Sequence, residues 1–399
     1  MRSTVLICGM VMVIGIISGD MVAVCHAESR IGPCGRNIPS VVMDGRHAGT
    51  IYIADSSEGV YADSSGGVYK STDGGDNWQA MNQGLYRKPK EWEKDVRELM
   101  SIYSLTMDLK NSKIIYVMTQ EGIYKSTNGG KKWEPFKRSP RIHKDFSNVS
   151  SLIIDPKDAD VLYARVFQAF YKSTDGGKKW VNIFDVTERK GYYPGAGIVP
   201  PPDVLAIDPQ DTEVLYLGHG GSANRDGGIY KSIDGGKNWD IILQTDAIVS
   251  ALTINPDNPK IIYAGTRSHG IFRSTDGGAR WEKINDGLKI MGTGTVYERI
   301  AYLMIDPVHS DTVYAGTGVG VFKSTDQGIQ WHGLTDGWPK EVAAIQLAID
   351  PKNPMIMYAG TANDYSESGN NGIYKSMDGG KSWEPKNNGL ACGKLIYVH

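Results

Sequence analysis

The chain has 399 residues and a formal net charge of -2 at pH 7, and its acidic and basic residues are interspersed. It therefore lacks the basic face that binds nucleic acid or an anionic membrane. The cysteines show no CxxC or CxxCH spacing and the histidines do not cluster, so we expect no metal and no cofactor.

Residues 1–27 have the pattern of an export signal. Arg2 provides a minimal positive n-region, residues 5–17 form a short apolar run, and Cys25-His26-Ala27 offers a cleavage site. The apolar run is shorter than the ~20 residues that span a bilayer. We therefore expect cleavage, export to the periplasm or the cell exterior, and no transmembrane span in the mature chain. A retained anchor is the alternative, and the bulky Val24 disfavours lipidation of the following cysteine.

A repeat fills the chain from residue 38 to 387, between a short arm (28–37) and a tail (388–399). Residues 228–239 read GIYKSIDGGKNW, and six variants of this pattern recur. A strand, a Gly-rich turn and a following Trp predict a β-hairpin over which the Trp packs. The Ser and Asp side chains are expected to bond nearby backbone NH groups. The residues to which we assign this structural role are Ser71, Asp73, Trp78, Ser126, Asn128, Trp133, Ser173, Asp175, Trp180, Ser232, Asp234, Trp239, Ser274, Asp276, Trp281, Ser324, Asp326, Trp331, Ser376, Asp378 and Trp383.

Each repeat also has an upstream half, in which an Asp or Asn precedes a Tyr by a constant interval. The pairs are Asp44 and Tyr52, Asp108 and Tyr116, Asp155 and Tyr163, Asp208 and Tyr216, Asn255 and Tyr263, Asp306 and Tyr314, and Asp350 and Tyr358. Apolar runs on both sides of the Asp or Asn predict two more strands joined by a fixed turn. Four strands in each of seven repeats predict an all-β fold, a single seven-bladed β-propeller of antiparallel blades.

The pattern Ser-x-Asp/Asn-x-Gly-x-x-Trp resembles the Asp-box, or BNR, repeat. That repeat occurs in sialidases, sortilin-type receptors, xyloglucan-hydrolysing propellers and photosystem II assembly-factor propellers. The resemblance covers nearly all of the chain from about residue 38 to 383 and implies the propeller fold. Because these relatives include enzymes, receptors and assembly factors, the resemblance implies no single function.

Length variation is confined to one side of the predicted ring. The interval from the Tyr to the box Ser and the connections between blades vary, whereas the turns between strands 1 and 2 and within the boxes do not. Variable loops on a rigid scaffold are where binding usually occurs. Our candidate binding residues on this side are Trp92, Tyr192, Tyr193, His219, Arg225, Asp226, Arg267, His269 and Tyr365.

Two of these loops have distinctive compositions. Residues 85–100 place apolar side chains at helical spacing and predict a short helix on the rim, either a solvated cap or a binding helix. Tyr192 and Tyr193 precede a Pro run at 200–202 that could present them to a partner, or they pack on an adjacent loop.

The sequence offers little support for catalysis, and we assign no catalytic residue. Asp63 and Asp226 each stand shortly before a Gly-Gly pair, which weakly resembles the xyloglucanase pattern. They fall in blades 1 and 4, however, too far apart for the carboxylate pair of a glycosidase. Adjacent strand residues such as Tyr297 and Glu298 point to opposite faces, unlike a sialidase nucleophile pair. We therefore expect a non-catalytic scaffold or assembly subunit that binds a protein. The alternative is a glycan-binding or carbohydrate-active propeller.

Cys34 and Cys392 remain after removal of the signal and flank the repeat array. In an exported protein such a pair predicts a disulfide across the ends of the ring. Two unpaired thiols at loose ends are the alternative.

Overall fold

The structure is a computed structural model. It describes residues 13–17, 20–24, 37–56, 66–87, 99–136, 149–166, 169–185, 204–220, 227–288, 290–291, 296–297, 299–339, 342–362 and 371–390. Every regular element in this part of the chain is a β-strand. Consequently, no described helix is long and apolar enough to cross a membrane.

The chain divides into two units, Met1–Gly32 and Pro33–His399. In the first unit, β1 (Val13–Ile17) pairs antiparallel with β2 (Asp20–Val24). This hairpin contains part of the apolar run that we interpret as an export signal, and that interpretation stays a prediction.

The second unit contains seven four-stranded antiparallel sheets, each drawn from one continuous segment. Blade 1 consists of β3 (Ser40–Met43), β4 (Ile51–Asp55), β5 (Gly67–Ser71) and β6 (Gln79–Ala80). Blade 2 consists of β7 (Ile102–Met107), β8 (Ile115–Thr119), β9 (Gly122–Ser126) and β10 (Glu134–Pro135). Blade 3 consists of β11 (Val149–Ile154), β12 (Leu162–Val166), β13 (Ala169–Ser173) and β14 (Val181–Asp185). Blade 4 consists of β15 (Val204–Ile207), β16 (Leu215–His219), β17 (Gly227–Ser232) and β18 (Asp240–Thr245).

The remaining three blades repeat this plan. Blade 5 consists of β19 (Val249–Ile254), β20 (Ile262–Thr266), β21 (Ile271–Ser274) and β22 (Glu282–Lys283). A small hairpin of β23 (Ile290–Met291) and β24 (Val296–Tyr297) follows it. Blade 6 consists of β25 (Ile300–Ile305), β26 (Val313–Thr317), β27 (Gly320–Ser324) and β28 (His332–Leu334). Blade 7 consists of β29 (Ala343–Ile349), β30 (Met357–Ala362), β31 (Ile373–Ser376) and β32 (Glu384–Pro385).

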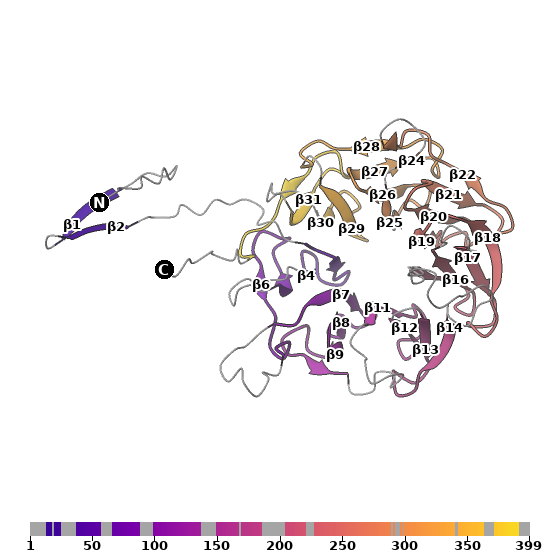
Figure 1. The fold of residues 1–399 in the computed structure, drawn as a ribbon, viewed down its shortest axis with the longest axis horizontal. Helices are drawn as coiled ribbons and strands as arrows, with labels where there is room; N and C mark the ends of the chain where they lie inside the picture. Colours follow the sequence, from indigo (N-terminus) through magenta and orange to yellow (C-terminus); the bar gives the residue numbers. More distant parts are fainter. Residues whose placement is uncertain are drawn as a thin grey trace, which may run out of the picture. The chain divides into compact units, whose positions relative to one another are not determined.

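Figure 1 shows these seven sheets following one another around a ring in chain order, with strands such as β25 and β29 near its axis and β18 and β22 at its rim. The first strands of blades 7 and 1, β29 and β3, are in contact, so the ring closes. This arrangement confirms the predicted seven-bladed β-propeller. The predicted rim helix falls on residues 88–98, which lie outside the described residues. Tyr86 and Leu99, on either side of them, form an antiparallel bridge.

The hydrophobic core lies between blades rather than in one central layer. The buried side chains of the described ring form seven clusters, and each cluster joins two neighbouring blades. Every cluster contains the Tyr of strand 2 from one blade and packs against the box Trp of the next. For example, Tyr52 of blade 1 and Trp133 of blade 2 share a cluster, and both are at most 2% exposed. The repeat therefore stabilises the ring through contacts with the neighbouring copy.

Candidate functional site

The Asp box is a closed set of hydrogen bonds. In blade 4 the Ser232 hydroxyl donates to Asp234 Oδ1 at 2.8 Å and accepts the Gly236 amide at 2.9 Å. Asp234 also accepts the amide and the side chain of Asn238, at 2.9 and 2.7 Å. The Asn238 bonds lower the pKa of Asp234 to about 2. The same Ser-to-Asp, Gly-to-Ser and main-chain-to-Asp bonds occur in the other six boxes, with Asn128 replacing the acid in blade 2. These side chains hold the turn.

Five of the described boxes are also held by hydrogen bonds from side chains of the preceding blade, those of blades 1, 2, 4, 5 and 6. At the closure of the ring, the Tyr358 hydroxyl and the Lys375 ammonium of blade 7 both donate to the Gly74 carbonyl of blade 1, at 2.8 and 2.9 Å. Lys231 makes the same bond to Gly277, and Arg273 to Gln327. The cation on strand 3 therefore links neighbouring blades.

The box Trp side chains fall into two classes. Trp78, Trp133, Trp331 and Trp383 are at most 6% exposed. Trp180, Trp239 and Trp281 are half-buried. The indole NH of Trp133 donates to the Met81 carbonyl of the preceding blade at 2.6 Å, whereas that of Trp281 donates to Gly278 in its own box at 3.1 Å.

A turn that the sequence analysis missed accompanies this division, and we call it the Gly-Leu turn although it ends in Gly-Trp in blade 6. After strand 4, blades 1, 5, 6 and 7 continue with Asn or Thr, any residue, Gly, and then Leu or Trp, at constant spacing from the box Trp: 82–85, 285–288, 335–338 and 387–390. Its last side chain is at most 8% exposed. Its second residue accepts the amide of the next blade's box Trp, as Gln83 does from Trp133 at 2.8 Å. A Cβ on Gly84 would collide with the Trp133 carbonyl, which is why this position needs Gly. Blades 2, 3 and 4 lack the turn, and the Trp residues that follow them are the half-buried ones.

We call the side of the ring that carries the Asp boxes and the turns between strands 1 and 2 the box face. The side that carries the loops between strands 2 and 3 and the connections between blades is the loop face. The loop-face candidates Trp92, Tyr192, Tyr193, Arg225, Asp226 and Tyr365 lie outside the described residues, as do Cys34 and Cys392.

The three described candidates on the loop face differ in exposure. His219, at the end of β16, is 7% exposed and packs edge-on against Phe184 at 6.4 Å. Arg267 follows β20 and is exposed. His269 Nε2 lies 3.3 Å from Asp246 Oδ1, and its Nδ1 lies 2.9 Å from Ser268 Oγ. Arg267 and His269 therefore share one short turn, whereas His219 belongs to the interface between blades 3 and 4.

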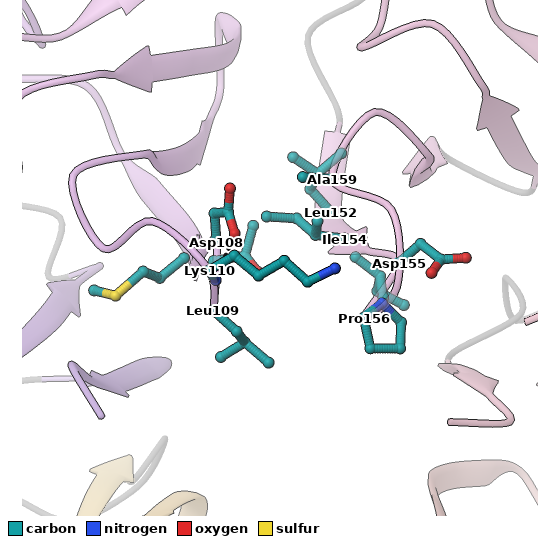
Figure 2. A pocket seen from close by; sticks show the side chains of 11 residues that line it. Asp108, Leu109, Lys110, Leu152, Ile154, Asp155, Pro156 and Ala159 are labelled. Atoms are coloured by element: carbon teal, nitrogen blue, oxygen red, sulfur yellow. Dashed lines mark hydrogen bonds between the residues drawn. The ribbon is translucent and has the colours of Figure 1, made fainter. Parts of the chain in front are cut away.

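The interface between blades 2 and 3 contains two clefts on the box face, and the sequence analysis identified neither. The inner cleft, of about 210 Å³, lies between the first strands and first turns of the two blades. Figure 2 shows the Lys110 side chain extending from the Asp108 turn toward the turn of Asp155 and Pro156. Lys110 Nζ donates to the Lys157 carbonyl, and Asp108 and Asp155 accept amides of their own turns. The inner cleft is therefore walled by side chains that hold the turns.

The outer cleft, of about 440 Å³, lies between the Asp boxes of blades 2 and 3. Its blade 2 wall carries Lys125, Asn128 and Lys132, and Gly176 lines it from blade 3. Within the described residues, no three His, Cys, Asp or Glu side chains lie close enough together to hold a metal ion. The polar groups of the outer cleft include the ammonium groups of Lys125 and Lys132, the Asn128 amide and the Glu134 carboxylate, which pairs with Lys132 at 2.9 Å.

Comparison with known proteins agrees with the repeat geometry. A family model described as Sortilin-Vps10, for sortilin or neurotensin receptor 3, matches residues 271–391. The chain is a seven-bladed Asp-box β-propeller. No curated protein matches the propeller in sequence.

Solved structures share the fold of this propeller. The GH74 enzyme of Niastella koreensis superposes with a TM-score of 0.62 at 18% identity, over 90% of this chain and 56% of the other. The GH74 xyloglucanase of Xanthomonas campestris superposes with 0.64 at 18% identity, over 90% and 55%. YCF48 from Cyanidioschyzon merolae superposes with 0.52 at 14% identity, over 83% and 94%. The propeller thus spans about half the length of the two GH74 proteins, and at these identities the likeness is one of fold.

Proposed function

We propose that this chain is an exported, non-catalytic propeller that binds a protein partner through its loop face. The observation that carries the proposal is the contrast between the two faces. On the box face the same Ser, Asp and Gly atoms hold the same turn in blade after blade. On the loop face the loop lengths and the side chains at the strand ends differ from blade to blade, as expected where a scaffold presents a binding surface.

The ends of strand 2 illustrate this difference. In blades 2, 5, 6 and 7 a Thr hydroxyl closes the turn by donating to a Gly carbonyl, at 2.8 to 3.0 Å. Blades 1, 3 and 4 carry Asp55, Val166 and His219 at this position. This position thus varies between blades while the Ser of the box does not, and we take the variation as support for a role of the loop face in recognition.

The electrostatics of the boxes also favour a non-catalytic role for their carboxylates. Hydrogen bonds lower the pKa of Asp73 to about 2, with the Asn77 side chain making the largest contribution. A glycosidase needs one carboxylic acid that stays protonated near neutral pH. The box acids are therefore suited to holding turns rather than to donating protons.

The proposal is tested by recovering the tagged protein from the export compartment of its host and identifying co-purifying proteins by mass spectrometry. We expect a stoichiometric partner that is lost from an Arg267→Ala, His269→Ala variant without a change in melting temperature. Changes at Tyr193, Arg225, Asp226 and Tyr365 extend this test. Lys381→Ala on the box face is the matched control and should retain the partner. If only Lys381→Ala lost the partner, the contact would lie on the box face and the proposal would be wrong.

A carbohydrate-active or glycan-binding propeller is the second candidate. The sequence around Asp226, with Gly227 and Gly228, and the shared fold with GH74 enzymes favour it. Incubation with xyloglucan and a glycan array distinguishes the two candidates. Released sugar that disappears with Asp226→Asn, in a protein that captures no partner, would overturn the scaffold proposal.

A further inference from the structure

The outer cleft lies between the Asp boxes of blades 2 and 3, on the box face. In blades 3, 4, 5 and 7 the strand-3 cation donates to a carbonyl of the next box, as Lys231 does to Gly277 at 2.9 Å. Lys125 lies over the ring of Tyr116, 5.0 Å from its centroid, as the strand-3 lysines of other blades lie over their own Tyr, and it also lies 5.9 Å from the centroid of Phe136. The Gly-Leu turn is missing after blade 2, as it is after blades 3 and 4.

The charge on the two boxes that flank this cleft is unusual. We compare five positions in each blade: the strand-3 cation, the box acid, the two residues before the box Trp and the one after it. Blade 2 has Lys125, Lys131 and Lys132 against Glu134, and blade 3 has Lys172, Lys178 and Lys179 against Asp175. The same positions are neutral in blades 4 to 7 and negative in blade 1. The boxes of blades 2 and 3 are therefore the basic pair of the ring, and the cleft between them is lined by two of these lysines, Lys125 and Lys132, together with Glu134.

Asn128 contributes to this charge. Its Oδ1 accepts the Ser126 hydroxyl at 2.9 Å and the Lys132 amide at 3.0 Å, as the Asp does in other boxes. The neutral side chain thus preserves the turn while removing a carboxylate from the cleft wall. An amide nitrogen, which can only donate, stands where the other boxes have an acceptor.

We propose that the outer cleft binds an acidic segment of a partner polypeptide. Lys125 would bind its Asp or Glu carboxylates, and Lys132 would do so in exchange for Glu134, with which it pairs at 2.9 Å. Phe136 and Pro135 on the same wall would pack against its aliphatic carbons. A long polyanion such as nucleic acid fits less well, because the chain as a whole is slightly acidic and gives no long-range attraction. This site lies on the box face and is independent of the loop-face proposal.

Fluorescence anisotropy with a fluorescein-labelled oligoglutamate peptide tests the site on the full chain at low ionic strength and pH 8. We expect saturable binding that weakens with salt, since the charges are exposed. Asn128→Asp should weaken it about threefold to tenfold, the size expected for one added surface charge at contact range. Lys132→Gln should act in the same direction, and Glu134→Gln should tighten binding.

The matched control is His332→Glu in blade 6, which adds one negative charge where Glu134, Glu282 and Glu384 occur in other blades. It should leave binding unchanged. Asn128→Asp recreates a box that six blades already contain, so its melting temperature should equal that of the parent. Absence of binding by the parent, or equal weakening by Asn128→Asp and His332→Glu, would overturn the proposal. The proposal would also be overturned if heparin bound, and Asn128→Asp weakened its binding, while the oligoglutamate peptide did not bind.

Discussion

The box Trp residues should differ in their contribution to stability according to the blade that precedes them. Trp133 is 1% exposed, and its indole donates to the Met81 carbonyl at 2.6 Å. Replacing a buried Trp by Ala costs ~3 to 5 kcal/mol, and the Met81 carbonyl also loses its indole donor. Trp281 is half-buried and bonds only within its own box in the described structure, so Trp281→Ala should cost roughly 1 to 2 kcal/mol.

Thermal unfolding followed by circular dichroism at a fixed scan rate measures this difference. At about 2 °C per kcal/mol for a large domain, Trp133→Ala should lower the melting temperature by ~6 to 10 °C and Trp281→Ala by ~2 to 4 °C. Trp133→Phe, which keeps most of the burial but loses the indole donor, should fall between them. Equal shifts for Trp133→Ala and Trp281→Ala would refute the division of the ring into two classes of interface.

Three further outcomes follow from the structure. Gln327 holds φ at 60° where six boxes have Gly, so Gln327→Gly should stabilise the protein by about 1 kcal/mol; a lower melting temperature would mean that the Gln327 bond to Asp311, at 2.8 Å, outweighs the strain. Three box carboxylates have a pKa of about 2 in the folded state: Asp73, Asp234 and Asp378. Because these pKa values lie below the unfolded value of 3.8, the stabilisation that the three carboxylates provide is present above about pH 4 and is lost as the pH falls toward 2. The free energy of unfolding in urea should therefore fall less steeply between about pH 4 and pH 2 in a triple Asp→Asn variant than in the parent, and an equal fall in both proteins would contradict this. Cys34 and Cys392 are expected to form a disulfide worth at most on the order of 5 kcal/mol, and two free thiols in non-reducing mass mapping of exported protein would exclude it.

The blade architecture could be predicted from the sequence because its signals are local. Asp44 accepts the Arg46 amide at 3.0 Å, two residues away, and Ser71 accepts the Gly75 amide at 2.8 Å, four residues away. Side chains that bond their own turn produce the same spacing in every copy. Strand number, strand order and the number of blades all follow from that spacing.

The contacts between blades were less visible because they join residues that are distant in sequence. The Gln83 carbonyl and the Trp133 amide are in different repeats, and the Gly-Leu turn that joins them occurs in four blades only. Its constant distance from the box Trp is a signal that a comparison of the segments after strand 4 would have found. The outer cleft follows a blade that lacks this turn, and its charge depends on the replacement of one Asp by Asn128. These two features of blade 2 could be interpreted only once the structure had shown which box lies beside it.

The ring is closed by noncovalent contacts between blades 7 and 1. Blades 7 and 1 share no strand, since each is built from one continuous segment. Even so, Trp78 donates its amide to the Asn388 carbonyl at 3.1 Å and its indole NH to the Lys386 carbonyl at 2.7 Å. Lys386 also pairs with Asp76 at 2.8 Å. Blade 7 carries the Gly-Leu turn, so this junction has the more complete of the two interface types, and the gap in that pattern falls between blades 2 and 5. Noncovalent contacts thus hold the ends of the ring together, and a disulfide between Cys34 and Cys392 would reinforce an interface that is already closed.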